Sequence, residues 1–417
     1  MRPGPGARTG VRLGAVTGPA VYIALVLMSG RSTLSSLGLA GPGSETYLAA
    51  VGLVWVLVLA AARSRLAPRP LDSGLASTVG LALVTLVGTT YSPLPDLAAS
   101  KAALVGLATL TVVLARAALH EPEDYGRLAG GFFAAAVVLA AVALVTGPGA
   151  QSRLAALWGG PNVFARFMFL GGASALYLWR TANPAGRWLV LGPGLVLLVV
   201  CLVLAGSRGA LVSALAACLG TLVLFSRRRL LTILQVAAVL GLVGVVLTLV
   251  PVPETLWERY SSIVEEQADL ATVAARLDLY RIALDAFLDS LWVGHGTAAF
   301  AVFSPYRSFR YPHNLFLEVA CEQGLVGLSV LAVLLGTGVG RLVRPRPGTA
   351  AAGAPGLRAY VFACLVFFLT AAQFSGDLYD SRFVLFFAAL GGGAWPEESY
   401  TRASGEGACR PPSPTAA

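Results

Sequence analysis

The stretch "YPHNLFLEVACEQGLVGL", residues 311–328, joins a polar start to a long apolar continuation. The apolar run predicts a helix over 314–340, which is long enough to cross a bilayer core, since a spanning helix takes about 20 residues. His313 and Asn314 stand where a long polar loop ends and this helix begins. The chain has only 3 histidines. The position of a histidine directly before a membrane helix therefore raises the question of its function.

The same apolar pattern recurs along the whole chain and determines its class. Of the 417 residues, 56% are hydrophobic and 12% are charged, with a mean hydropathy of +0.75, whereas a soluble domain carries roughly 25% charged residues. Continuous runs predict helices rather than the alternating strands of a barrel, because lipid offers backbone groups no partners. The predicted fold is an all-α polytopic membrane protein with about 12 transmembrane helices.

The predicted spans divide the chain into four parts. Residues 1–250 hold the first nine helices, 251–313 form one long loop, and 314–396 hold the last three helices. Residues 397–417 are rich in Gly, Ser and Pro and are predicted to be a disordered tail. The predicted spans are 13–30, 46–62, 74–91, 97–115, 128–147, 162–180, 188–206, 209–226, 230–250, 314–340, 357–374 and 382–396.

The basic residues predict an orientation. The net charge is +9, and Lys101 is the only lysine. Placing the N-terminus in the cytoplasm gathers most of the arginines on that side, as the positive-inside rule expects. An even number of spans returns the C-terminus to the same side. The prediction is a multi-pass protein of the cytoplasmic membrane, with both termini cytoplasmic and the loop at 251–313 outside. No basic and aromatic array indicates a nucleic-acid partner.

The long loop contains a predicted amphipathic helix, "VAARLDLYRIALDAFLDS", residues 273–290. Arg281 falls on its polar face, within reach of Asp278 and Asp285. Arg276 falls on its apolar face, where a cation needs an anion from the protein or a ligand, unless it reaches back to solvent. These alternatives stay open. The predicted apolar face consists of Val273, Leu277, Tyr280, Leu284, Phe287 and Leu288.

Two further arginines fall at the predicted outer face. Arg208, in "LAGSRGALVSAL", lies between two apolar runs with almost no loop, and is either functional or a turn arginine that reaches lipid headgroups. Asn162 and Arg166, in "WGGPNVFARF", lie one helical turn apart. A cation inside the membrane edge needs a partner. The preferred partner for Arg166 is a carboxylate of "SGDLYDSR", residues 375–382, namely Asp377 or Asp380.

Residues 311–328 supply the remaining candidates. Asn314 is expected to cap the helix that follows it. His313 is either an interfacial histidine or a general base, since imidazole titrates near neutral pH. Glu318 and Glu322 are expected to face the bundle and pair with arginine as structural residues. Together, Arg208, Arg276 and His313 come to one face and suit displacement of a diphosphate by a hydroxyl.

Several other patterns carry no cofactor prediction. "GHGTAA", residues 294–299, matches a dinucleotide-binding pattern but lies in the loop without a βαβ unit. The histidines lack zinc-ligand spacing. Four of the five cysteines lie in apolar runs, where cysteine behaves as a small hydrophobic residue. No metal and no other cofactor is predicted.

At these motifs the sequence resembles the O-antigen ligase and O-antigen polymerase superfamily of bacterial envelope glycosyltransferases. The stretches that carry the resemblance lie in order between about 150 and 340: "GGPNVFARF", "LAGSRGALVSAL", "RLDLYRIALDAFLDSLWVGHGTAAF" and "PHNLFLEVACEQGL". The last, with its His-Asn pair and Glu-x-Gly ending, is the most specific. Tyr280 stands where the family usually has tryptophan. Arg166 is not part of the family pattern.

The resemblance implies a GT-C-like bundle of transmembrane helices with an active site at its outer face. It implies a glycan donor carried on a polyprenyl diphosphate, typically undecaprenyl, and an acceptor that is a glycan, a lipid or another hydroxyl compound. By motif match, His313 would deprotonate the acceptor, and Arg208 and Arg276 would bind the diphosphate. Asn162, Arg166 and Asn314 are supporting candidates.

The resemblance leaves the reaction itself open. A ligase, a polymerase and an oligosaccharyltransferase acting on protein share these features. The alternative from another class is a transporter or flippase of a lipid-linked or anionic substrate, which predicts inverted repeats and broken helices near the membrane midplane. No such repeat is apparent in the sequence. A purely structural membrane protein would leave Arg276 unexplained.

Overall fold

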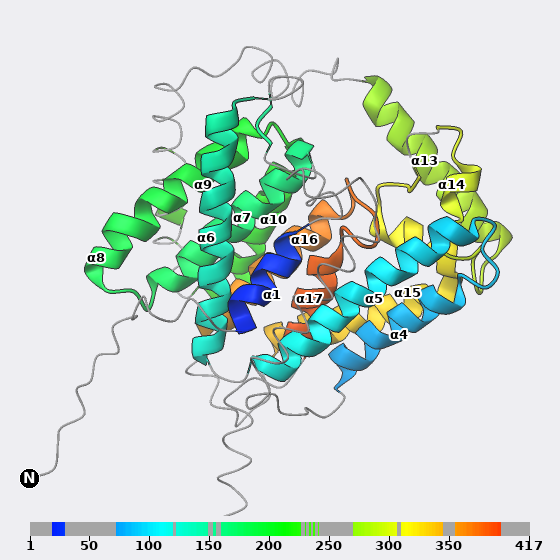
Figure 1. Ribbon diagram of the computed structural model, residues 1–417, viewed down its shortest axis with the longest axis horizontal. Coiled ribbons are helices and arrows are strands. Elements are labelled where there is room, and N and C mark those ends of the chain that lie inside the picture. Colours follow the sequence, from blue (N-terminus) through cyan, green and yellow to red (C-terminus); the bar gives the residue numbers. More distant parts are fainter. Residues whose placement is uncertain are drawn as a thin grey trace, which may run out of the picture.

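The computed structural model describes residues 19–29, 72–119, 122–148, 153–155, 160–226, 270–306, 310–344 and 355–392, with isolated positions between 230 and 241. Within these ranges all regular structure is helical, which agrees with the predicted class (Figure 1). The helices are α1 Pro19–Met28, α4 Ser73–Val87, α5 Pro95–Ala118, α6 Pro122–Thr146, α7 Gly160–Trp179, α8 Pro184–Gly186, the π-helix η3 Arg187–Leu191, α9 Gly192–Leu204, α10 Arg208–Phe225, α13 Leu270–Asp289, α14 Phe300–Phe303, α15 Leu315–Val343, α16 Pro355–Ala371 and α17 Arg382–Gly391.

Five segments of the described chain are long and apolar enough to cross a membrane: Pro95–Ala118, Glu123–Thr146, Pro184–Leu204, Arg208–Phe225 and Leu315–Val343. The chain is therefore a multi-pass membrane protein. Most predicted spans overlap a helix. The span 46–62 lies outside the described residues, and so does almost all of 230–250. The number of about 12 spans stays a prediction, as does disorder in the tail, which lies outside the described residues.

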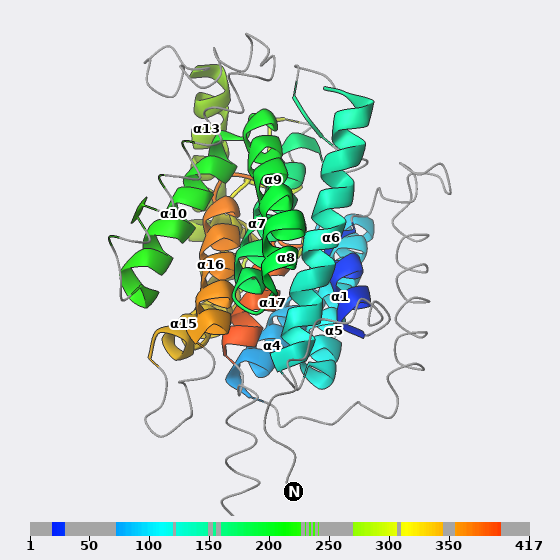
Figure 2. The ribbon, with the colours of Figure 1, turned by 90° about the vertical axis from the view of Figure 1, so that its left-hand side faces the viewer.

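The short helix α17 forms the centre of the bundle, where it contacts α4, α5, α15 and α16 (Figure 2). Every residue of α17 is buried. Its Phe383 ring stacks on Phe368 of α16, with ring centroids 4.4 Å apart. Small residues allow close packing around it, as is common between membrane helices. A Cβ on Gly338 of α15 would lie 2.7 Å from the Ala388 carbonyl oxygen.

Helix α15 is broken at Gly324, whose φ of 62° and ψ of −157° are not helical. Residues 291–296 form a strap that bonds to backbone groups on both sides of the break. His295 N and Gly296 N donate to the carbonyls of Cys321 and Glu322, each at 3.0 Å. Leu325 N and Val326 N donate to Leu291 O and Trp292 O at 2.8 and 3.2 Å.

This strap explains the "GHGTAA" pattern in structural terms. Gly294 and Gly296 have φ of +67° and +93°, a region that favours glycine. A side chain on Gly294 would collide with the backbone of α15 at Glu322. The glycines therefore permit the loop to lie directly against a broken membrane helix, and they fix α13 and α15 relative to each other.

The amphipathic helix predicted over 273–290 is present as α13, but part of its predicted apolar face is wrong. Leu277, Leu284 and Leu288 are 50%, 46% and 63% exposed. The buried residues are instead Leu279, Ala283 and Ala286, which cluster with Phe300 of α14 and Cys321 of α15. The sequence offers two apolar stripes, and the one with alanines permits the closer approach to α15.

Candidate functional site

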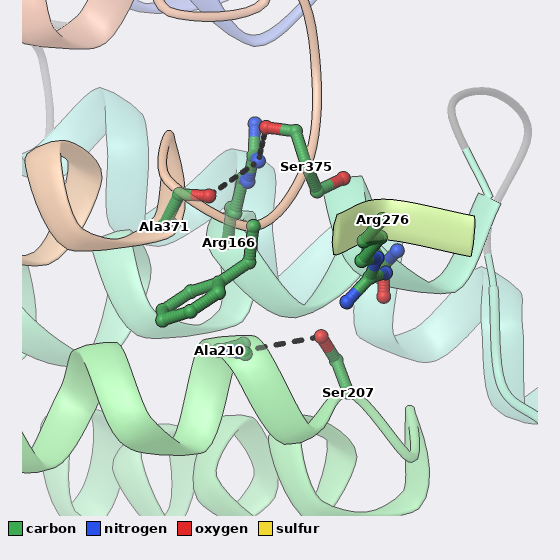
Figure 3. Close-up of a pocket in the computed structure, with 9 residues that line it drawn as sticks. Arg166, Ser207, Ala210, Arg276, Ala371 and Ser375 are labelled. Carbon is green, nitrogen blue, oxygen red and sulfur yellow. Dashed lines mark hydrogen bonds between the residues drawn. The ribbon is translucent and has the colours of Figure 1, made fainter. Parts of the chain in front are cut away.

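A polar pocket lies where four distant parts of the chain meet (Figure 3). Helices α7 and α13 each contribute an arginine, and the start of α10 and the end of α16 supply the remaining walls. None of the nine lining residues is acidic. They are Asn162, Arg166, Ser207, Gly209, Ala210, Arg276, Ala371, Phe374 and Ser375.

Arg276 is half-buried and lies opposite Ser207 in the pocket (Figure 3). Within the described part of the chain it has no ion pair and no hydrogen bond. Arg281, five residues later, is 77% exposed at its side chain and lies 3.7 Å from Asp278 Oδ1, which confirms that part of its predicted pairing. The two arginines of α13 thus differ: one faces solvent and an acid, and the other faces the pocket.

Arg166 is buried, and its Nη2 atom donates to two backbone carbonyls, Ser375 O at 2.6 Å and Ala371 O at 3.3 Å. The prediction of a carboxylate partner is therefore only partly right. Asp380 makes the largest favourable electrostatic contribution at Arg166. The hydrogen bonds nevertheless go to main-chain groups, because carbonyls at the end of α16 and just after it face Arg166. Asp380 itself lies 3.9 Å from Arg382.

Arg208 is the first residue of α10, after the N-cap Ser207, whose Oγ accepts from Ala210 N at 3.4 Å. Its side chain is half-buried. Arg208 is flanked by the pocket residues Ser207 and Gly209 but is not itself among the lining residues. The structure thus brings Arg276 into the pocket and leaves Arg208 at its edge.

Arg153 is a residue that the sequence interpretation missed. It is buried, its Nε donates to Ala205 O at 2.9 Å, and its Nη2 donates to Asn162 Oδ1 at 3.2 Å. Arg153 thus joins the ends of α7 and α9 and orients Asn162 in the pocket wall. Its position on the predicted outer side, against the charge bias, is the signal that could have identified it.

The turn before α15 places His313 next to this pocket. Asn314 Oδ1 accepts from Phe316 N at 3.0 Å and Leu317 N at 3.1 Å, so the predicted helix cap is confirmed. His313 has a φ of +61°, a conformation that is rare for non-glycine residues and concentrates at functional sites. Its ring packs edge-on against Tyr311, with centroids 4.6 Å apart.

The electrostatic surroundings of His313 include both pocket arginines. Burial lowers the pKa of His313, Arg276 and Arg166 lower it further, and Asp377 opposes them, so that the pKa falls to about 4. The imidazole is therefore neutral at neutral pH. His313 is not among the residues that line the pocket, but the charges of both pocket arginines act on it.

The connection between α16 and α17, residues 372–381, holds several of these elements together. Its carbonyls accept from Leu315 N at 3.0 Å, from Tyr280 Oη at 2.7 Å and from Arg166 Nη2 at 2.6 Å. Burial raises the pKa of Tyr280, while Arg276 and Asn314 lower it. The phenol thus keeps the proton that it donates to Gln373 O. These particular contacts could not be predicted from the sequence, because their acceptors are backbone groups.

Glu318 and Glu322 face the bundle as predicted, but their partner is not an arginine. Lys101 of α5 forms an ion pair with Glu318 Oε1 and another with Glu322 Oε2, the latter at 2.6 Å. Glu318 Oε1 also accepts from Leu378 N at 3.2 Å. The correction follows from packing, since α5 and α15 both lie against α17. No group of His, Cys, Asp and Glu among the described residues has the geometry of a metal site.

Comparison with known families gives one match. A family model described as O-antigen ligase matches residues 193–332, while no curated protein matches the chain at a significant level. The matched stretch runs from α9 into α15 and includes Arg208, Arg276 and His313. Asn162 and Arg166 lie outside it. Over residues 193–332, the chain is therefore similar to the O-antigen ligase family.

Proposed function

We propose that the protein transfers or polymerises a glycan carried on a polyprenyl diphosphate, at the outer face of the cytoplasmic membrane. The observation that carries this proposal is a pocket with two arginines and no acidic lining residue, close to a half-buried neutral histidine. The donor is a polyprenyl-diphosphate-linked oligosaccharide. The acceptor is the hydroxyl of a glycan, a lipid or another molecule.

The pocket suits the diphosphate. Guanidinium groups bind phosphate oxygens with paired, charge-assisted hydrogen bonds. Arg276 has no partner among the described residues, so its charge is available to a ligand. The pocket also lies at the start of α10, and the N-terminal end of a helix attracts anions. Arg208 begins that helix and supplies a further cation at the edge of the site.

In this mechanism, a ring nitrogen of His313 takes the proton of the acceptor hydroxyl as its oxygen attacks the anomeric carbon. The bond from that carbon to the diphosphate oxygen breaks, and its electron pair leaves with the diphosphate. Arg276, Arg166 and Arg208 stabilise the charge that develops there. Donor binding also prepares the base, because a bound anion offsets the arginines that lower the pKa of His313.

The transporter alternative predicts broken helices, and α15 is broken at Gly324. However, backbone groups freed by that break are bound by the chain's own residues 291–296. They are thus not open to an ion or substrate, as the discontinuous helices of transporters require. This observation favours glycan transfer.

The test uses the purified full-length protein in liposomes, supplied with polyprenyl-diphosphate-linked oligosaccharides. A ladder of lengthened chains would establish a polymerase, and a single product that needs an added acceptor would establish a ligase. Donor that crosses the bilayer without reacting would establish transport and overturn the proposal. Arg276→Ala is compared with Arg281→Ala, which removes an exposed arginine of the same helix.

A further inference from the structure

Lys101, Glu318 and Glu322 form an ionic cluster inside the bundle, between α5 and α15. Their side chains are 9%, 1% and 1% exposed. Two carboxylates share one ammonium group. The second oxygen of each carboxylate, Glu318 Oε2 and Glu322 Oε1, has no hydrogen-bond partner among the described residues. Burying such a cluster is costly, and apolar residues of similar size often give equal or greater stability. Its presence is therefore better explained by what it holds than by stability.

The cluster holds the connection between α16 and α17. Glu318 Oε1 is fixed from one side by Lys101 and accepts from Leu378 N on the other, at 3.2 Å. Three residues earlier in the same connection, Ser375 O accepts from Arg166 at 2.6 Å. Glu318 thus holds the connection in place, and the connection in turn binds Arg166 of the pocket.

The same carboxylate lies close to the start of α15. Glu318 follows Asn314 by one helical turn, and its N–H donates to Asn314 O at 2.9 Å. The next residue after Asn314, Leu315, donates its N–H to Ala372 O of the connection at 3.0 Å. The start of α15, which follows His313, is therefore joined to the connection that binds Arg166 by two hydrogen bonds. One runs from Leu315 N to Ala372 O, and the other runs from Leu378 N to Glu318 Oε1.

We propose that Glu318, with Lys101 as its counter-ion, is a positioning residue for the candidate site. It fixes the connection at 372–381 against the start of α15 and so sets the separation between Arg166 and His313. Glu322 is the second carboxylate that forms an ion pair with Lys101. The effect on transfer rests on the proposed function, whereas the effect on the connection does not.

Amide hydrogen exchange on the substrate-free protein tests the structural half. Glu318→Leu removes the acceptor of Leu378 N, and we expect exchange across 372–381 to rise by at least about tenfold. Glu318→Gln keeps the shape and an acceptor oxygen but loses the charge, so we expect a smaller rise of about threefold. The control is Ser174→Ala, which removes a buried hydrogen bond to Tyr360 elsewhere in α7.

The proposal is supported if exchange is fastest in Glu318→Leu, intermediate in Glu318→Gln and slowest in the wild type, with the rise confined to 372–381 and the start of α15. Exchange in that region equal to that of Ser174→Ala in both Glu318 variants overturns it. If Glu318→Leu fails to insert into the membrane, the isosteric Glu318→Gln is sufficient by itself. An unchanged exchange rate across 372–381 in that variant also overturns the proposal.

The kinetic half uses the liposome assay with the same variants. Misplacing a group by about 1 Å can cost 100-fold in rate, so Glu318→Leu is expected to lower kcat by at least about tenfold with donor KM within about threefold. Glu318→Gln should recover part of that loss. An unchanged kcat with altered exchange overturns the link to catalysis. A wild-type protein that transfers nothing contradicts the proposed function instead, and leaves the exchange result standing.

Discussion

Lys101 is a buried cation and Arg276 is a half-buried one, and their surroundings are opposite. Lys101 is enclosed with two carboxylates of α15. Arg276 lines a pocket with a second arginine and without an acidic neighbour in its walls. A cation that the chain neutralises itself is part of the architecture. A cation left without an anion among its described neighbours is available to a ligand. The connection at 372–381 contributes to both regions, since Ser375 lines the pocket of Arg276 and Leu378 N donates to Glu318, the partner of Lys101.

The largest effect is expected where the protein's own charges are unbalanced. Lys101→Met leaves two carboxylates buried together without a cation, and breaking a buried ion pair in this way typically costs about 3–5 kcal/mol. We expect a marked fall in the thermal unfolding temperature in detergent. The triple variant Lys101→Met, Glu318→Gln, Glu322→Gln should recover most of it. A single variant as stable as the wild type would show that the cluster does not carry the charges assigned here.

The opposite outcome is expected for Arg276. Arg276→Ala removes no ion pair among the described residues, so stability should change by less than about 0.5 kcal/mol. Transfer should fall by about 100- to 1000-fold, as when one donor to a developing charge is lost. Arg281→Ala should leave both quantities near the wild-type values. Loss of stability together with activity in Arg276→Ala would place Arg276 with Lys101, as a structural cation.

The pocket arginines lower the pKa of His313, and this effect should be visible in the pH dependence of transfer. The pKa of free His313 is lowered to about 4 by burial, Arg276 and Arg166, so kcat/KM should be flat near neutrality and fall only as pH approaches 4. In Arg276→Ala, one cause of lowering is gone, and the acid limb of the residual activity should move upward toward 6.5. An acid limb near 6.5 in the wild type would contradict the burial of the base.

The same pKa has a consequence for stability. The folded pKa lies below the unfolded value, so the unfolded chain binds more protons in the window between about 4 and 6.5. The contribution of His313 is therefore fully present above that window and is lost as pH falls through it. His313→Gln should reduce the loss of thermal stability between pH 6.5 and pH 4. An unchanged pH dependence would show that His313 is not buried as a neutral ring.

Sequence alone could predict those features that local patterns determine. Hydropathy predicts the helical membrane class, and the residue types around His313 and Asn314 predict a capped helix start. The position of Arg276 on the packed side of its helix also follows from periodicity, although the leucine stripe assigned to that side is exposed. Each of these depends on residues within a few turns of each other.

What sequence could not predict depends on distance along the chain or on backbone groups. Lys101 and Glu318 are separated by 217 positions, so no local pattern indicates that this lysine replaces the expected arginine. Arg166 was expected to find a carboxylate, but carbonyls of the connection after α16 take its hydrogen bonds. Carbonyl acceptors exist at every residue, and only the path of the chain decides which ones a buried arginine meets.

The smallest effect on stability and transfer is expected at Asn314. Asn314→Ala removes the acceptor for Phe316 N and Leu317 N, and a lost N-cap costs about 1 kcal/mol. Asn314→Ser keeps a capping oxygen and serves as the control. If Asn314 acts only as a cap, the Ala variant should lose stability and lower kcat little, and Ser should restore both. A kcat that falls more than about 10-fold in both variants would instead assign the amide a role in the site, since hydroxyl and amide caps satisfy the helix alike but differ in what they present to a substrate.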